Sequence, residues 1–171
     1  PVLDPDTGKQ IALATRRVGR ADWLRGTPDG LQAMRITDAS EEVMAGDLLV
    51  APPDPEATGR ALAPHAAASM QGRVAAILQE GRWAMLHDIV ALNRGSRHGL
   101  DAGSVVNVVR AVRIASHESP QAFIPASGID EPVATLLVVE VLEHASLAIV
   151  MRAQEPFTLG AAFASPDTAN R

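Results

Sequence analysis

The sequence has no cysteine and no tyrosine, and it contains few other aromatic residues. Its 171 residues include three phenylalanines and two tryptophans. Without cysteine, the chain holds no disulfide, no zinc–thiolate site and no thiol nucleophile. Sugar sites and single-stranded nucleic-acid sites usually rely on several exposed aromatic rings. The scarcity of such rings therefore argues against both kinds of site.

Positive charge and long apolar runs are also scarce. There are 15 Lys and Arg residues against 20 Asp and Glu residues, so the net charge is −5, which opposes binding to a polyanion such as nucleic acid. Apolar runs such as 136–139, which stops at Glu140, are far shorter than the roughly 20 residues of a membrane-spanning helix. We therefore expect no nucleic-acid partner and no membrane span in this portion. The chain begins at Pro1 without a leader pattern, so we expect any signal peptide to lie outside it.

Short β-branched or alternating runs, separated by Gly and Pro, predict a mainly β fold with little helix. The predicted strands are 10–18, 31–37, 47–51, 71–78, 86–93, 104–114, 133–143 and 146–152.

Two proline-rich segments divide this pattern. Segment 52–70 contains four prolines and segment 115–132 contains three, and proline cannot donate a hydrogen bond to a strand ladder. The sequence therefore predicts two small barrel-like β modules, residues 1–53 and 71–166, with 54–70 as a connection and 115–132 as a loop excursion. The sequence leaves open whether the two modules pack as one body, and a weak similarity between 41–52 and 155–166 suggests that they are related.

The strongest local signal is the turn within 89–109. Three glycines at 95, 99 and 103 permit unusual backbone angles between two β-branched strands. The polar residues of this turn form the predicted recognition patch, which consists of Asn93, Arg94, Arg97 and Asp101. Ordinary turn chemistry and solubility would select the same residues, so both interpretations stay open.

Catalytic and metal-binding patterns are weak. Ser96, His98 and Asp101 are too close in one tight turn to form a nucleophile, a base and its partner. The five histidines lack the spacing of a zinc site, and Asp4 to Gly8 begins like a calcium loop but lacks the later ligands. We therefore expect no catalytic residue, no metal and no cofactor.

Three other groups of residues have simpler interpretations than a binding site. Glu140 and Glu143 are three positions apart, so they point to opposite faces of a strand and do not share a site. The basic run at Arg16, Arg17 and Arg20 is interpreted as a solvated strand end. Trp23 and Trp83 are predicted to pack in the core or at its rim rather than to serve as sugar platforms.

Several segments together resemble one family. They are residues 6–12, 18–19, 46–49, 64–65, 72–74, 90–109 and 136–151. Their glycines and apolar strands resemble the C-terminal region of proteobacterial envelope proteins that carry an N-terminal LysM peptidoglycan-binding domain. The turn at 93–103 is also similar to turns in β-barrel modules of flagellar and cell-shape assembly proteins.

The resemblance implies a periplasmic, non-catalytic accessory region that makes protein or peptidoglycan-associated contacts in the cell envelope. The LysM module itself is absent from these residues, so its ligand positions have no counterpart here. Two alternatives stay open: a carbohydrate-binding module that uses Asn93, Arg94, Arg97 or a tryptophan, and an enzyme whose site is assembled only in three dimensions. The sequence leaves the partner and the oligomeric state undetermined.

Overall fold

The computed structural model describes residues 1–51, 62–79, 81–115 and 123–166, and its regular structure is almost entirely β. A short 3₁₀ helix, η1 (Ser96–His98), accompanies the strands. The strands are β1 (Val2–Leu3), β2 (Gln10–Ala12), β3 (Gly19–Gly26), β4 (Gln32–Ala39), β5 (His65–Ala66), β6 (Gln71–Ile77), β7 (Trp83–Ala84), β8 (Ile89–Leu92), β9 (Ser104–Ala115), β10 (Phe123–Val141), β11 (Ser146–Ala153), β12 (Phe157–Thr158) and β13 (Ala162–Ala164). Across the described ranges, no helix has the length and apolar character needed to cross a membrane.

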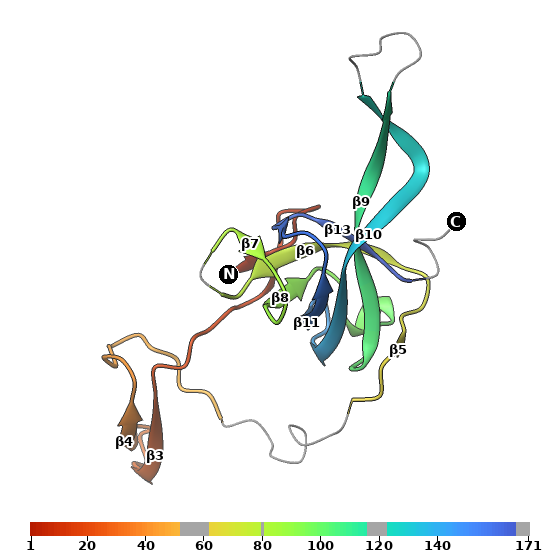
Figure 1. The fold of residues 1–171 in the computed structure, drawn as a ribbon. Helices are drawn as coiled ribbons and strands as arrows, with labels where there is room; N and C mark the ends of the chain where they lie inside the picture. Colours follow the sequence, from red (N-terminus) through yellow and green to blue (C-terminus); the bar gives the residue numbers. More distant parts are fainter. Residues whose placement is uncertain (52–61, 80, 116–122, 167–171) are drawn as a thin grey trace. The chain divides into compact units, whose positions relative to one another are not determined.

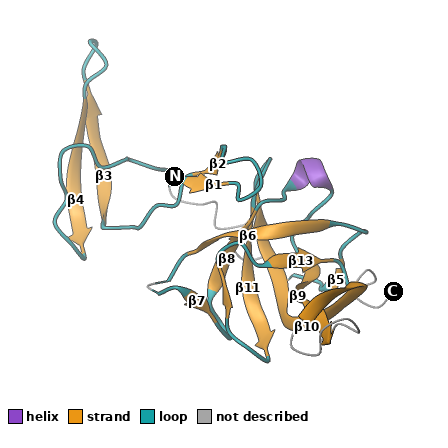
Figure 2. Cartoon of the chain, turned by 90° about the horizontal axis from the view of Figure 1, so that it is seen from above, coloured by secondary structure: helices purple, strands orange, loops and turns teal. Residues whose placement is uncertain are grey.

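Six of these strands form a closed antiparallel barrel (Figures 1 and 2). Their order is β10-β11-β8-β6-β13-β9, and pairing of β9 with β10 closes the ring. Closure satisfies the strand edges that an open sheet would leave free. The short strand β5 adds to β9 in parallel and pairs His65 with Ser104. The prediction of a mainly β protein with a barrel-like module is confirmed.

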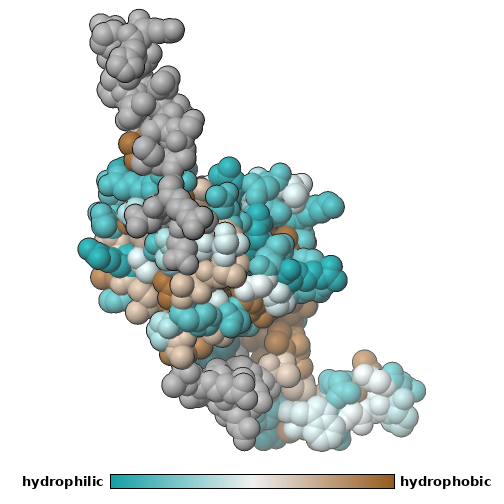
Figure 3. All heavy atoms as spheres, turned by 90° about the vertical axis from the view of Figure 1, so that its right-hand side faces the viewer, coloured by the Kyte–Doolittle hydropathy of each residue, from teal (hydrophilic) through white to brown (hydrophobic). Residues whose placement is uncertain are grey.

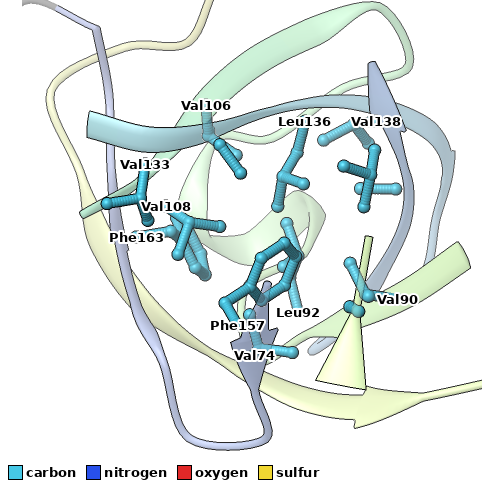
Figure 4. Packing of buried hydrophobic residues seen from close by; sticks show 14 of the residues in the cluster. Val74, Val90, Leu92, Val106, Val108, Val133, Leu136, Val138, Phe157 and Phe163 are labelled. Atoms are coloured by element: carbon cyan, nitrogen blue, oxygen red, sulfur yellow. The ribbon is translucent and has the colours of Figure 1, made fainter. Parts of the chain in front are cut away.

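The barrel interior is filled by aliphatic side chains and two phenylalanines (Figure 4). On β9, Val106 and Val108 are buried while Val105 and Asn107, which precede them, are less so, because successive side chains of a strand point to opposite faces. The labelled core residues are Val74, Val90, Leu92, Val106, Val108, Val133, Leu136, Val138, Phe157 and Phe163. Outside the barrel, hydrophilic side chains alternate with smaller hydrophobic areas on the face seen in Figure 3.

The chain divides differently from the predicted modules 1–53 and 71–166. One compact unit combines 1–14 with 61–171, and the other is 15–60. The N-terminal strands β1 and β2 join the barrel unit because Val2 is buried in a small cluster with Ala75 and Ala91. The described residues of the second unit, 15–51, form no barrel: their strands are those of the hairpin β3–β4.

The predicted loop excursion at 115–132 is largely strand. Strand β10 starts at Phe123, and together with β9 it continues beyond the barrel as a two-stranded ribbon (Figure 1). Residues 116–122 lie outside the described part. Proline is tolerated here because the pairing shifts register after Pro125 and after Pro132, and bulges are places where a strand admits proline.

Two further strand predictions are wrong. Segment 47–51 is irregular, and 13–18 is irregular beyond β2. Consequently the similarity between 41–52 and 155–166 does not reflect a shared fold: the second segment contains β12 and β13, whereas the first contains no strand among its described residues.

Candidate functional site

The turn between β8 and β9 packs Leu100 into the core of the barrel. It leaves β8 at Leu92, passes through η1 and enters β9 at Ser104. Gly99 and Gly103 have φ angles of +84° and +101°, which residues other than glycine rarely adopt. Gly95 is extended, but a Cβ there would collide with the Leu142 carbonyl and with the backbone of Ala145. All three glycines therefore have structural roles in this turn.

Asn93 is an internal anchor rather than a surface recognition residue. It is 2% exposed, and its Nδ2 donates to Asp4 Oδ1 at 2.7 Å and to Asp6 Oδ2 at 2.9 Å. Its Oδ1 accepts from the Arg73 backbone N–H at 2.6 Å. The hydrogen bond from Asn93 lowers the pKa of Asp4. The prediction that Asn93 is part of an exposed patch is therefore wrong.

This anchor also explains the segment that resembles the start of a calcium loop. Asp4 accepts from the Asp6 backbone N–H at 3.0 Å and from Thr7 Oγ1 at 2.9 Å, and the Gly8 N–H donates to the Asp4 carbonyl. The segment is a turn whose carboxylates face the amide of Asn93. The described residues contain no group of three or more His, Asp or Glu side chains placed to hold a metal ion.

The two arginines of the predicted patch are bound to groups of the chain itself. Arg94 donates from Nε to the Gln71 carbonyl at 2.8 Å and from a terminal nitrogen to the Asn93 carbonyl at 2.8 Å. Arg97 lies across from Glu143, with Nε 2.6 Å from the carboxylate. Glu143 is also 3.7 Å from His144. The structure therefore gives both arginines partners within the barrel unit.

Asp101, the fourth predicted residue, lies in a cluster with His65 and Ser104. Its Oδ1 is 2.9 Å from His65 Nε2 and accepts from Ser104 Oγ at 2.5 Å. His65 Nδ1 is 3.0 Å from the Ala63 carbonyl. The Ala63 carbonyl and then Asp101 raise the pKa of His65, whereas the hydrogen bonds from Ser104 and His65 lower the pKa of Asp101.

This Ser–His–Asp cluster lacks the geometry of a catalytic triad. In a triad, the aspartate binds one ring nitrogen and the serine faces the other. Here Ser104 Oγ and Asp101 both approach Nε2 of His65, at 3.5 and 2.9 Å, and the serine is 1% exposed. The cluster instead holds β5 against β9.

The trio considered from sequence does not come together either. His98 Nδ1 accepts the Gly95 backbone N–H at 3.1 Å, so it caps η1, and burial lowers its pKa. Asp101 faces His65 instead. Sequence reasoning missed His65 because the two residues lie 36 positions apart.

A shallow pocket of about 220 Å³ lies beside the Asn93 anchor. Its charged lining consists of Asp6, Arg73, Arg94 and Asp130. Arg73 donates to Asp6 at 2.7 Å and to the Gly160 carbonyl at 3.0 Å. Because opposite charges are balanced and both arginines are already hydrogen-bonded, the pocket has no strong preference for an anion or a cation.

The hairpin β3–β4 has one apolar and one charged face. Trp23 pairs with Met34 and Ala21 pairs with Ile36, and directly paired residues point to the same side of a sheet. Trp23 Nε1 donates to Gln32 at 2.5 Å, which places Gln32 on that side as well. No residue of 15–51 is buried, and Trp23 and Ile36 are 62% and 55% exposed.

Trp83 is also exposed, at 60%. It lies on β7, where it pairs with Thr158 while its neighbour Ala84 is buried and pairs with Phe157. The prediction that the two tryptophans pack in the core or at its rim is therefore wrong as regards the core.

The basic run and the two glutamates do not form a shared site. Arg16 of the basic run lies 2.5 Å from Glu41. Glu140 pairs with Leu147 on the strand, whereas Glu143 forms an ion pair with Arg97.

Comparison with known proteins gives no assignment: no family model, no curated protein and no solved structure matches this chain.

Proposed function

We propose that this chain is a non-catalytic accessory region of a LysM-type envelope protein, and that it makes protein contacts in the periplasm. The apolar face of the β3–β4 hairpin carries the proposal, because none of the described residues 15–51 is buried. A two-stranded hairpin is marginally stable in water and needs a covering surface.

The arrangement of polar groups supports a contact role more than a small-molecule site. Asn93 is buried, Arg94 binds backbone carbonyls, and Arg97 and Asp101 have partners within the unit. By contrast, Trp23, Leu31, Ile36, Leu48, Leu49 and Val50 are all more than half exposed in one short unit. Several large apolar side chains left exposed within one short unit favour a protein contact surface. The periplasmic location rests on the family resemblance.

The test is sedimentation with insoluble peptidoglycan, with and without solubilised envelope proteins. We expect the chain to pellet only when those proteins are present, and Ile36→Asp to abolish pelleting. Arg97→Ala is the matched control on the barrel and should pellet like the wild type. Pelleting with peptidoglycan alone, or hydrolysis of peptidoglycan by the purified chain, would overturn the proposal.

A second candidate function is direct glycan binding. The observation that favours it is the exposure of both tryptophan rings, since sugar sites stack on such faces. Titration with soluble peptidoglycan fragments should then change tryptophan emission, and the change should disappear in Trp23→Phe or in Trp83→Phe. A flat titration in the wild type would exclude this candidate.

A further inference from the structure

The outer edge of β3 is unpaired among the described residues. Its one described partner is β4, and the two strands form a sheet by themselves. Both strands have eight residues, which is long for a free edge, and such edges template pairing with another strand. The charged residues of the hairpin indicate which strand could pair with this edge.

The charged face of the hairpin carries opposite charges in register. Arg20 pairs with Asp38, and Asp22 pairs with Arg35. These four side chains lie on the side opposite to Trp23, because residues 20 and 22 alternate with 21 and 23 along the strand. Each pair forms a row of two charges across the hairpin. At the β3 edge, one row presents the positive group of Arg20 and the other presents the negative group of Asp22.

We propose that β3 pairs with β3 of a second copy of this chain, antiparallel and centred on Ala21. In this register Arg20 lies opposite Asp22 of the second copy, and Asp22 lies opposite its Arg20. Each row then continues across four strands with alternating sign: Asp38 and Arg20 of one copy, followed by Asp22 and Arg35 of the other. A two-fold axis generates both rows from one set of contacts.

The apolar side of the same register is also complementary. Gly19 lies opposite Trp23 of the second copy, so the indole ring covers a position that has no side chain. A Cβ at Gly19 would approach the Asp38 carbonyl to 2.5 Å, so the chain cannot fill that position itself. Aromatic rings placed across from edge glycines stabilise strand pairs. The result is a four-stranded sheet with one continuous apolar face, which passes the size at which sheets become stable.

The charge pattern favours a second copy over an unrelated partner, because the edge sequence is complementary to itself in this register. Pairing over the five residues 19–23 gives an interface well below about 1,200 Å², the size class of weak and reversible association. This inference rests on the proposed contact function, since it names one partner of the same hairpin.

The first test is analytical ultracentrifugation of the full chain over a concentration series. We expect the weight-average mass to rise from 18.0 kDa toward twice that value. Arg20→Asp and Asp22→Arg should each stay monomeric, because each places like charges opposite one another across the axis. An equimolar mixture of the two variants should regain the dimer, since each then meets the opposite charge. Arg82→Asp, an exposed arginine on the barrel unit, should dimerise like the wild type.

A second test does not depend on these charge reversals. The chain has no cysteine, so Ala21→Cys places a single thiol on the two-fold axis and should give a disulfide-linked dimer under mild oxidation. Ala33→Cys on β4 should stay monomeric. The proposed pairing with a second copy would be overturned by any of three results. These are a monomeric wild type, a mixture of the two variants that does not associate, or equal cross-linking at positions 21 and 33. The peptidoglycan sedimentation described above would still report on the contact function separately.

Discussion

His65 Nε2 lies 2.9 Å from Asp101 Oδ1, although the two residues are 36 positions apart. The other ring nitrogen, Nδ1, lies 3.0 Å from the Ala63 carbonyl. Both partners are acceptors, so the ring satisfies both only when each nitrogen carries a proton. The structure therefore favours the charged form of His65, in agreement with its raised pKa.

The first prediction is that attachment of residues 63–67 to the barrel depends on pH. Because the pKa of His65 is raised on folding, its contribution is complete below about pH 6.5 and is lost as the pH rises through the folded-state pKa. Because the pKa of Asp101 is lowered, its contribution is complete above about pH 4 and is lost as the pH falls through its folded-state pKa. Attachment should thus be firmest at about pH 5 to 6.

The measurement is hydrogen exchange of the His65 and Ala67 amides, which donate to the Gly103 and Val105 carbonyls. After correction for intrinsic rates, their protection should fall between pH 6 and pH 8.5. His65→Gln should remove this dependence, whereas His144→Gln, on the exposed turn after β10, should keep it. Equal protection at both pH values in the wild type would contradict the prediction.

The second prediction concerns the Asn93 anchor. Asn93→Ala removes two hydrogen bonds to carboxylates and leaves the Arg73 N–H without its acceptor. We expect a loss of about 2–3 kcal/mol in the free energy of unfolding, measured by urea denaturation. Asn107→Ala is the control, because Asn107 accepts one side-chain bond, from Thr135, and should lose about 1 kcal/mol. Equal losses would show that Asn93 is not an anchor.

The third prediction separates two kinds of glycine in the turn after β8. Gly95 is extended but surrounded by backbone, whereas Gly99 has φ +84° and open space at its Cβ position. Gly95→Ala should destabilise the barrel by about 3 kcal/mol or more, since carbonyl and amide groups cannot move aside. Gly99→Ala should cost about 1 kcal/mol, the strain of a left-handed alanine. Thermal unfolding of both variants measures which one is less stable. A larger loss in Gly99→Ala than in Gly95→Ala would refute the distinction between the two glycines.

The barrel strands were predictable because their local pattern and their environment agree. In the predicted strand 104–114, Val106 and Val108 are buried while residues 105, 107 and 109 are less so, and the structure gives β9 as Ser104–Ala115. Strand β10 was predicted to start ten residues late because Pro125 and Pro132 resemble loop residues, whereas register shifts accommodate them. Strand β3 was missed, although Arg20 to Trp23 alternates charged and apolar residues, because four residues are a short period-2 signal.

The candidate site was less predictable than the fold. The turn sequence identifies Asn93, Arg94, Arg97 and Asp101 as polar, but it does not contain the groups that bind them. Asp4 lies 89 positions from Asn93, and Gln71 lies 23 positions from Arg94. Long-range pairs of this kind form only when the tertiary fold brings distant segments together, so a local motif cannot distinguish an exposed recognition residue from an internal anchor.

The fourth prediction uses the two exposed tryptophans as reporters of hairpin pairing. In dilute solution both rings are solvated, so native emission should lie close to that of the urea-unfolded chain. As concentration rises, Trp23 should be covered over Gly19 of a second copy, while Trp83 on the barrel should not change. Trp83→Phe, which retains Trp23, should therefore show a blue shift that grows with concentration, and Trp23→Phe should show none. A shift confined to Trp23→Phe would place self-association on the barrel, because Trp83 would then be the ring that leaves water.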